Sequence, residues 1–384
     1  MAFKNFSASY AGHVVDDNLG LQGTPANDRR YSNENLAQAF DWALNFSTHL
    51  ETLGYDEFWM AEHHFQPEGY ECIPNLLMLS LYLASHTKRL KFGCGFNITP
   101  MWHPLRLAED FAMADILTNG RVIFGVGRGY HSREVETFGS PMLDGDANRE
   151  LFEEQVEVLI KALSEESFSH HGKHYKIPAD VEYRGYQLKE LSVVPRPLRQ
   201  PVDIWQPLVS GNPRGIDFMA KKGIKALVAN TPEPIREERL STYQKTAKEY
   251  GRDLQMGEDI AFGYRFFIGE TEEKAIEEAK PYFEEAMKFA APLGLMQLRP
   301  EQISAVGNRA MAPFTDLPSL EAAVENKVWL CGPAESIVDH LKEVEAKYPG
   351  VERVNLGAVM GMPQEVFKDQ LTKFAEGVLP AFKS

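Results

Sequence analysis

A carboxylate and two imidazoles stand side by side in the stretch WMAEHHFQPEG, residues 59–69. These side chains, Glu62, His63 and His64, follow an apolar run and precede a proline and a glycine, where a buried strand is expected to end. An imidazole exchanges a proton near neutral pH, so the stretch is suited to acid–base chemistry. Taken alone, the same residues are equally compatible with a polar rim that merely satisfies the end of a sheet.

The histidines do not predict a metal centre. His63 and His64 are neighbours, and adjacent residues of a strand point to opposite faces, so they do not readily bind one ion. The sequence contains no HExxH pattern. A second cluster, His170, His171 and His174, has looser spacing and lies in a polar insertion, which favours a solvated loop. We therefore expect no metal.

A glycine-rich loop follows another predicted strand in RVIFGVGRGYH, residues 121–131. Its three alternating glycines let the backbone approach a ligand closely, and Arg128 places a fixed cation among them. A dinucleotide-binding fingerprint runs GxGxxG directly into a helix. Here the spacing is GxGxG, and the next helix is expected only near residue 147, so dinucleotide binding is not predicted.

A possible phosphate site occurs in PLVSGNPRG, residues 207–215. Ser210, Gly211 and Asn212 offer a hydroxyl, an amide and backbone N–H groups at the start of a short helix, which suits a phosphate. Arg149, in the preceding unit, is suited to bidentate contact with the same group. Taken alone, Ser-Gly-Asn-Pro is more often a plain turn and helix cap.

These residues need a scaffold, and β-rich segments alternate along the chain with segments of helical period. Eight strands are predicted, at residues 3–10, 56–62, 90–98, 121–127, 202–209, 225–230, 260–269 and 352–360. Regular alternation of strand and helix is typical of a parallel sheet covered by helices. Eight units favour an α/β fold of the (β/α)8 TIM-barrel type, whose active site lies at the carboxyl ends of the strands.

Amphipathic helices are predicted between the strands. The clearest span residues 32–54, 147–163 and 332–345. We expect Asp146 to cap the second of these, Gly54 to close the first, and Pro333 to be the first residue of the third.

Two long stretches interrupt this alternation. Residues 165–200 and 291–327 exceed a plain connection, and loops of that length in a compact domain are usually lids or disordered. The chain has no Pro/Ser-rich linker and no short repeat. We therefore expect a single domain over residues 1–384, elaborated by these two insertions.

The composition is that of a globular protein with an acidic surface. The net charge of −15 and the isoelectric point near 5.3 disfavour nucleic acid or an anionic membrane as partner, because either would repel such a surface. Cys72, Cys94 and Cys331 form neither a disulfide framework nor a CxxC pair, which favours a reducing compartment. The N-terminus lacks a signal-peptide pattern, and no apolar run approaches the roughly 18 residues that span a bilayer. We expect a cytoplasmic protein.

The chain resembles the bacterial luciferase-like flavin-dependent monooxygenases over nearly its whole length. The matching stretches are residues 55–65, 90–104, 120–130, 170–177, 210–215 and 328–341. The most specific signal is EHHF followed by GRxxFGxGRGY in this order and spacing. The resemblance implies a (β/α)8 barrel, reduced FMN supplied by a separate flavin reductase, reaction with O2 through a C4a-hydroperoxyflavin, and a homodimer or higher homo-oligomer.

The resemblance also implies roles for particular residues. The active-site histidine of the family falls on His63, with His64 beside it. The peptide that faces the flavin ring, often a non-prolyl cis bond, falls on Gly95 and Phe96 and is followed by Asn97. The phosphate and ribityl contacts fall on Arg128, Arg149, Ser210, Gly211 and Asn212.

Two departures from the family bear on the substrate. Luciferase has a reactive cysteine in the glycine loop, and this chain has Gly127 there, so oxygenation is expected without light emission from an aldehyde. Residues 12–31 lengthen the first loop and are expected to reshape the substrate pocket.

The expected activity is oxygenation of a small apolar organic substrate, which the sequence does not name among terpenes, ketones, aldehydes and heteroaromatics. Two alternatives stay open: hydride transfer with the deazaflavin F420, and a non-catalytic flavin-binding protein.

Overall fold

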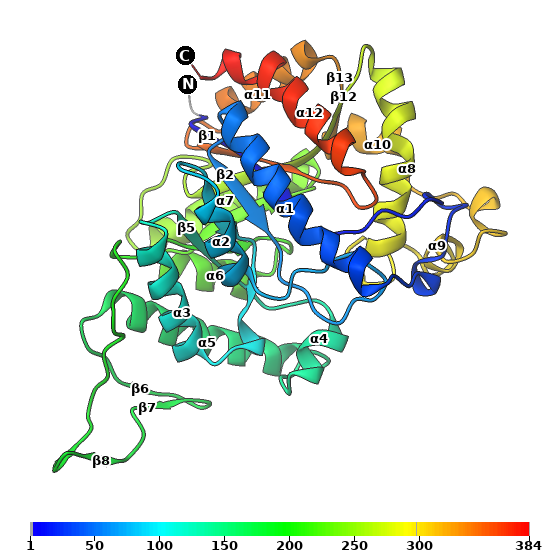
Figure 1. Ribbon diagram of the computed structural model, residues 1–384. Coiled ribbons are helices and arrows are strands. Elements are labelled where there is room, and N and C mark those ends of the chain that lie inside the picture. Colours follow the sequence, from blue (N-terminus) through cyan, green and yellow to red (C-terminus); the bar gives the residue numbers. More distant parts are fainter. Residues whose placement is uncertain (1–2, 297, 384) are drawn as a thin grey trace.

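Eight parallel strands close into a ring inside a layer of helices in the computed structural model, which describes residues 3–296 and 298–383 (Figure 1). The strands are β1 (Asn5–Tyr10), β2 (Glu57–Met60), β3 (Lys91–Cys94), β5 (Val122–Gly127), β10 (Ile204–Pro207), β11 (Lys225–Ala229), β12 (Ile260–Ile268) and β14 (Arg353–Gly357). Each pairs in parallel with the next, and β14 pairs with β1 to complete the ring. The predicted (β/α)8 barrel is confirmed, with all eight predicted strands present.

The outer layer contains the helices that follow these strands. They are α1 (Asn33–Leu53), α2 (Leu76–Ser85), α3 (Pro104–Leu117), α4 (Ser132–Thr137), α5 (Gly145–Ser164), α6 (Pro213–Lys222), α7 (Glu233–Glu249), α8 (Glu272–Ala290), α11 (Ala334–Lys347) and α12 (Gln364–Gly377). As predicted, α1 ends at Gly54, which adopts a φ of 82° that other residues rarely take. Two predicted helix starts were wrong. Asp144 caps α5, because its side chain accepts from the backbone of Asp146, and Pro333 precedes α11 in an extended conformation.

The barrel interior is filled at its centre and open at its carboxyl end. A small inner core fills the centre and consists of Trp59, Phe96, Ile123, Trp205 and Ala261. On β11 the outward residues Ala226 and Val228 are buried under helices, whereas the inward residues Leu227 and Ala229 are accessible. Because accessibility rises toward the end of the strand, the barrel has a hollow mouth above its inner core.

The insertion 165–200 begins and ends on the side of the barrel opposite to the mouth, and its first part packs back along α5, where the backbone of Lys173 and His174 donates to Glu154. It contains two short hairpins, formed by β6 (His170–His171) with β7 (Lys176–Ile177) and by β8 (Glu182–Tyr183) with β9 (Tyr186–Gln187). The insertion joins the end of α5 to the beginning of β10, and connections of that kind lie at the amino-terminal end of a barrel. Figure 1 shows it projecting away from the ring. Its second hairpin, β8–β9, is exposed and therefore does not supply the lid expected from the length of the insertion.

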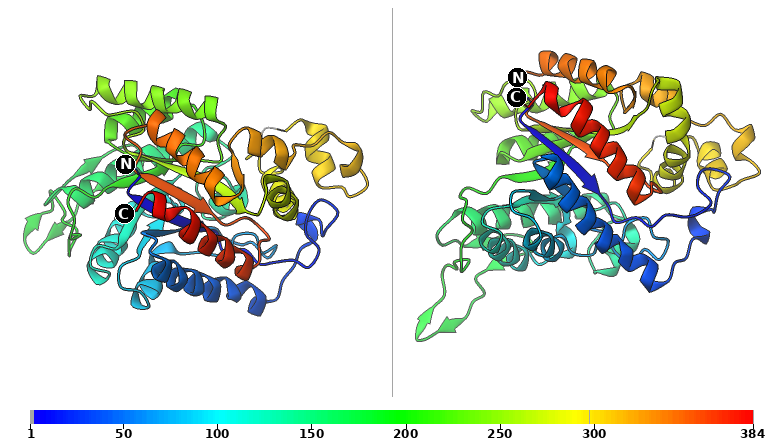
Figure 2. Two further views of the ribbon diagram at one scale, coloured as in Figure 1. Left: turned by 90° about the horizontal axis from the view of Figure 1, so that it is seen from above. Right: turned by 45° about the horizontal axis from the view of Figure 1, so that its top comes forward.

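The insertion 291–327 lies on the side of the mouth. It contains α9 (Pro300–Val306) and α10 (Leu320–Glu325), and it leads into β13 (Trp329–Gly332), a strand that sequence reasoning missed. β13 pairs with the carboxyl half of β12, so that β12 forks between the barrel and this extra strand. Figure 2 shows the insertion beside the long first loop. Arg309 Nε donates to the carbonyl of Gly23 over 2.6 Å across that contact.

A buried ion pair fixes the first loop, residues 11–32, to α8. Arg29 is 1% exposed and donates to Glu285, which is fully buried, over 2.6 Å. Lys288 lies 2.6 Å from the same carboxylate, and Tyr70 donates to it over 2.8 Å. The Arg29 guanidinium also stacks over the Tyr70 ring at 4.2 Å. The first loop is therefore held by desolvated charges rather than by an apolar contact alone.

Candidate active site

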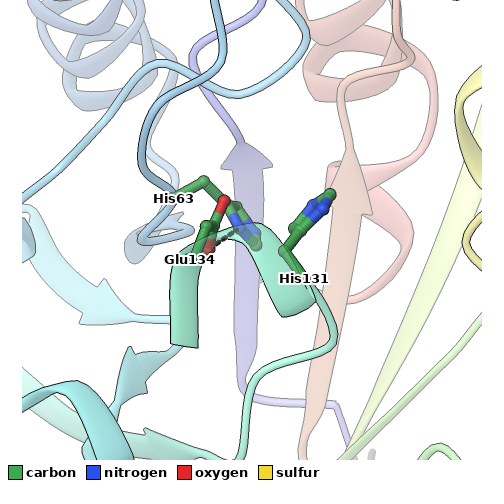
Figure 3. A group of neighbouring side chains, drawn as sticks. All are labelled: His63, His131 and Glu134. Carbon is green, nitrogen blue, oxygen red and sulfur yellow. Dashed lines mark hydrogen bonds and ion pairs between the residues drawn. The ribbon is translucent and has the colours of Figure 1, made fainter. Parts of the chain in front are cut away.

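His63 lies at the centre of a buried hydrogen-bond network where the chain leaves β2 (Figure 3). Its Nδ1 is 3.2 Å from Glu134 Oε2, and Figure 3 shows the two side chains meeting in front of the barrel strands. Its Nε2 is 2.9 Å from the hydroxyl of Tyr130. That hydroxyl donates to Glu71 Oε1 over 2.7 Å. Residues from the two connections that follow β2 and β5 thus converge on one imidazole.

The charge of the network makes His63 a donor at both ring nitrogens. Burial disfavours the imidazolium, but the carboxylates of Glu71 and Glu134 outweigh it and raise the pKa of His63 above its ordinary value. Burial likewise opposes ionisation of Glu71, yet His63 and His131 hold its pKa below the ordinary value. Since Tyr130 donates to Glu71, it accepts from His63. The geometry therefore favours a hydrogen-bond donor at His63 over a base.

His131 and Gln66 complete the network around the two carboxylates. His131 Nε2 is 2.9 Å from Glu71, and Gln66 Nε2 donates to Glu134 over 3.0 Å. Within the described residues, His63, His131 and Glu134 form a group whose donor atoms lie within 4.8 Å of one another, close enough for metal ligands. An imidazolium has no free lone pair, so the group is better suited to holding protons. The prediction that the protein uses no metal is untested.

His64 points away from His63, as expected for neighbours on a strand. Its Nε2 is 3.1 Å from Glu62 Oε1, and its ring lies edge-on to Phe138 at 4.9 Å. Glu62 is buried and also accepts from the backbone of Ile98 and from the indole of Trp102, over 2.9 and 2.8 Å. Glu62 and His64 therefore brace the loops around the mouth, while His63 faces the network.

The third barrel strand supplies the edge of the inner core. The peptide bond between Gly95 and Phe96 is cis, as the resemblance implied. Phe96 packs against Trp59 with ring centroids 6.3 Å apart, so an aromatic surface floors the mouth. Asn97 is fully buried and donates to the carbonyl of Gly125 over 2.8 Å. Its side chain therefore fastens two neighbouring strands of the barrel.

Three arginines gather at the beginning of α6. Arg128 donates to the side chain of Asn148 over 2.9 Å, and burial together with the charges of Arg149 and Arg214 lowers its pKa. Arg214 pairs with Glu153 over 2.6 Å. Arg149 is half-buried and makes no hydrogen bond or ion pair within the part of the chain that the structure describes. Asp146, Glu150 and Glu153 offset part of this charge, and the unpartnered Arg149 is the cation best suited to a phosphate.

The turn before α6 is open enough to receive such a group. Ser210, Gly211 and Asn212 are exposed, and nothing lies within 4 Å of where a side chain on Gly211 would begin. The Asn212 side chain caps the helix by accepting from the backbone of Gly215 over 3.3 Å. Arg149 Nη1 lies 3.2 Å from where a β-carbon on Gly215 would stand. The predicted phosphate contacts therefore form one basic turn at a helix N-terminus.

The basic turn and the His63 network belong to the same mouth. Arg128 and Tyr130 are two residues apart on the loop after β5, and Tyr130 contacts His63. Sequence reasoning missed Tyr130 and His131, although both lie in the glycine-loop motif. It also missed Glu71 and Glu134, which carry no local signal because their partners lie about 60 to 70 residues away.

We expect the protein to lose stability in mild acid because of His13 in the first loop. It is 3% exposed, its Nε2–H donates to the carbonyl of Met362 over 2.9 Å, and burial lowers its pKa to about 4. His13 takes up a proton near pH ~6.5 in the unfolded chain but only near pH 4 in the folded chain. The free energy of unfolding therefore falls as pH falls between these two values. We expect a loss of about 2 to 3 kcal/mol, measured by urea unfolding at pH 7 and 4.5.

The His13→Gln variant should flatten this dependence, because it cannot take up the proton. His86→Gln, which changes an exposed histidine, serves as the control and should leave it intact. An unchanged pH slope in His13→Gln would refute the assignment.

A barrel with the His63 network and the basic turn at its mouth is typical of an enzyme. The sequence model described as "Luciferase-like monooxygenase" matches residues 21–352, so the chain belongs to the luciferase-like monooxygenase family. It is an enzyme of the flavin-dependent monooxygenase class, as the resemblance in its sequence implied. Among the described residues, no helix combines the length and apolarity needed to cross a bilayer.

Three similar proteins illustrate the family and its fold. The chain is 27% identical over 358 residues to the oxygenase component of the flavin-dependent trigonelline monooxygenase of Acinetobacter baylyi, covering 90% of each chain. Its fold matches the oxygenating constituent of 3,6-diketocamphane monooxygenase from Pseudomonas putida in complex with FMN, with a TM-score of 0.72, 17% identity, and coverage of 99% of this chain and 98% of that one. It also matches the coenzyme F420 dependent tetrahydromethanopterin reductase from Methanopyrus kandleri, with a TM-score of 0.66, 18% identity and coverage of 100% of both chains.

Proposed function

We propose that the protein binds reduced FMN at the barrel mouth and uses O2 to oxygenate a small, largely apolar organic substrate. The observation that carries this proposal is the convergence of a basic turn and a proton-holding network on opposite ends of one loop, with Arg128 in one and Tyr130 in the other. FMN has a phosphate at one end, which fits the basic turn, and a flat ring at the other, which fits the His63 network.

Some residues of the mouth bind the cofactor, and others hold a proton beside it. Arg149, Arg128 and the Ser210 turn hold the phosphate, and the aromatic surface of Phe96 and Trp59 lies beneath the ring. The His63–Tyr130 pair holds a proton beside it. Bound reduced FMN supplies the electrons and the centre for oxygen activation. The C4a-hydroperoxyflavin that the resemblance implies stays a prediction.

Water exclusion is assigned to the loops on the side of the mouth. Oxygen-activating flavin chemistry loses its product as peroxide when water enters, so a dry site is needed. The first loop, residues 11–32, and the insertion 291–327 contact each other there. These two segments are therefore the proposed lid.

The partners are part of the same proposal. A separate flavin reductase supplies reduced FMN, as the designation "oxygenase component" of the Acinetobacter baylyi relative suggests. We place the reaction in the cytoplasm, where NAD(P)H is available and where Cys72, Cys94 and Cys331 remain free thiols. Assembly as a homodimer or higher homo-oligomer stays a prediction.

Turnover with a flavin reductase, NAD(P)H, O2 and a substrate panel tests the function directly. Oxygenated product coupled to flavin oxidation supports it. The fold is shared with an F420-dependent reductase, so absorbance titrations with FMN and F420 are needed alongside. Tight F420 binding with oxygen-independent turnover would replace the proposal by hydride transfer, and flavin binding without any turnover would indicate a binding protein.

The phosphate contact predicts a selective loss of affinity in Arg149→Gln. Removing a charge-assisted contact should weaken FMN binding by roughly 10- to 100-fold. Riboflavin lacks the phosphate, so its affinity should not change. Fluorescence titration of both ligands measures the difference. Arg106→Gln on α3, whose side chain is 66% exposed, is the control. Equal affinity of the unmodified protein for FMN and riboflavin would contradict the assignment.

A further inference from the structure

Arg265 is a cation inside the barrel mouth that the proposed flavin site does not use. It lies on β12 and reaches inward over Gly357, where a β-carbon would overlap its guanidinium. Its Nη1 donates to the carbonyl of Ala358. Within residues 3–296 and 298–383 it makes no other hydrogen bond and no ion pair. Most of its five N–H donors therefore lack a protein acceptor.

Two other largely buried arginines are paired with carboxylates. Arg29 is bound to Glu285, and Arg353, below the inner core, is bound to Glu57. A half-buried guanidinium without such a partner costs free energy. The missing partner therefore suggests that an anion from outside the chain completes the site.

The electrostatic surroundings keep Arg265 charged. Burial lowers its pKa to about 10, while the negative charge of Glu71 and the hydroxyl of Tyr130 oppose this shift. Glu71 does not neutralise it directly, because its oxygens already accept from Tyr130, His131 and Gln66. His13, the nearest titratable group of the first loop, is neutral at pH 7. The guanidinium therefore faces the mouth with its full charge.

Arg265 also lies apart from the basic turn. The ring order places β5 and β10 side by side, with β11 between β10 and β12. A cofactor whose phosphate lies between β5 and β10 leaves the β12 wall to a second molecule. The inward residues around that wall are small or absent: Ser9 and Ala229 are accessible, and Gly357 has no side chain. The wall beside the guanidinium is therefore made of small residues.

We propose that Arg265 binds a carboxylate of the substrate, so that the substrate of this enzyme is a small organic acid with an apolar body. The inference rests on the proposed function, which it deepens by adding one charged group to the substrate. The planar guanidinium matches a carboxylate with two parallel hydrogen bonds, which fixes the orientation of the acid as well as its affinity. Arg265 is thus a specificity-determining residue of the mouth.

The test compares acids with amides of the same shape. Benzoate and benzamide, nicotinate and nicotinamide, and octanoate and octanamide are titrated calorimetrically into the FMN-loaded protein. We expect at least one acid to bind roughly 10- to 100-fold more tightly than its amide. Arg265→Gln should abolish that preference, and Arg265→Lys should keep part of it, because a point charge lacks the fork of the guanidinium.

Two further variants keep the result decisive. Gly357→Ala keeps the arginine at position 265, but its new methyl group displaces the guanidinium. It should therefore also reduce the preference for the acid over its amide. Arg106→Gln, on the outer surface, should leave it unchanged. Far-UV circular dichroism and melting curves confirm that each variant is folded.

The outcomes separate this inference from the proposed function. If no acid binds more tightly than its amide, or if Arg265→Gln retains the preference, the inference is rejected. If Arg265→Gln weakens FMN binding and leaves the preference unchanged, the guanidinium serves the flavin and the inference is again rejected. Failure of the unmodified protein to bind FMN at all would instead reject the proposed function.

Discussion

Replacing His63 with alanine is expected to lower the rate of substrate oxygenation by about 10²- to 10⁴-fold, the range typical for loss of a positioned proton donor or acceptor. The variant should still consume reduced FMN and O2, releasing hydrogen peroxide in place of product. The physical reason is the imidazolium held between Glu71 and Glu134, which keeps a proton fixed at the barrel mouth. The ratio of product formed to flavin oxidised measures the effect.

Two variants show whether the effect belongs to the network. His64→Ala removes the neighbouring imidazole, which contacts Glu62 and lies outside the network, and it should change coupling much less. Tyr130→Phe removes the hydroxyl that links His63 to Glu71, and it should reproduce part of the His63 defect. Unchanged coupling in folded, FMN-binding His63→Ala would disprove the role of this residue.

Replacing Glu285 with alanine is expected to destabilise the protein by about 3 to 5 kcal/mol, the range for breaking a buried ion pair. The change leaves both Arg29 and Lys288 buried without their carboxylate. Urea unfolding and thermal melting measure the loss. Glu277→Ala on the exposed face of the same helix is the matched control and should stay within about 0.5 kcal/mol of the unmodified protein.

The same variant tests the lid. If the first loop excludes water, loosening its anchor at Glu285 should increase peroxide release even where the protein remains folded. A stability loss no larger than that of Glu277→Ala would show that the ion pair contributes little.

The sequence predicted the barrel because its signals are local. Apolar strands bounded by glycine and proline, and helices with one apolar face, are readable in windows of a few residues. β13, Trp329–Gly332, was missed because it lies outside the ring of eight strands and pairs with only half of another strand. The helix starts at Asp144 and Pro333 were misplaced by one or two positions, since several residues there are able to cap a helix.

The candidate site was predictable only where its residues carry motifs. His63 and Arg128 lie in short, unusual stretches at strand ends, and both lie at the mouth. Glu71 contacts Tyr130 and His131, and Glu134 contacts His63, between loops that are distant in the sequence, which no local pattern reveals. Arg265 did carry a signal, as the one charge in the buried strand IAFGYRFFIG, but its meaning depends on the missing partner that only the folded chain shows.

The fork in β12 allows the position of Arg265 to change independently of the basic turn. Up to Tyr264 the strand is zipped to β14, and from Arg265 onward it follows β13 instead. Exchanging the segment that leads into β13 would re-aim the guanidinium while leaving the basic turn before α6 untouched. The substrate specificity of the barrel can therefore change while its cofactor site stays the same.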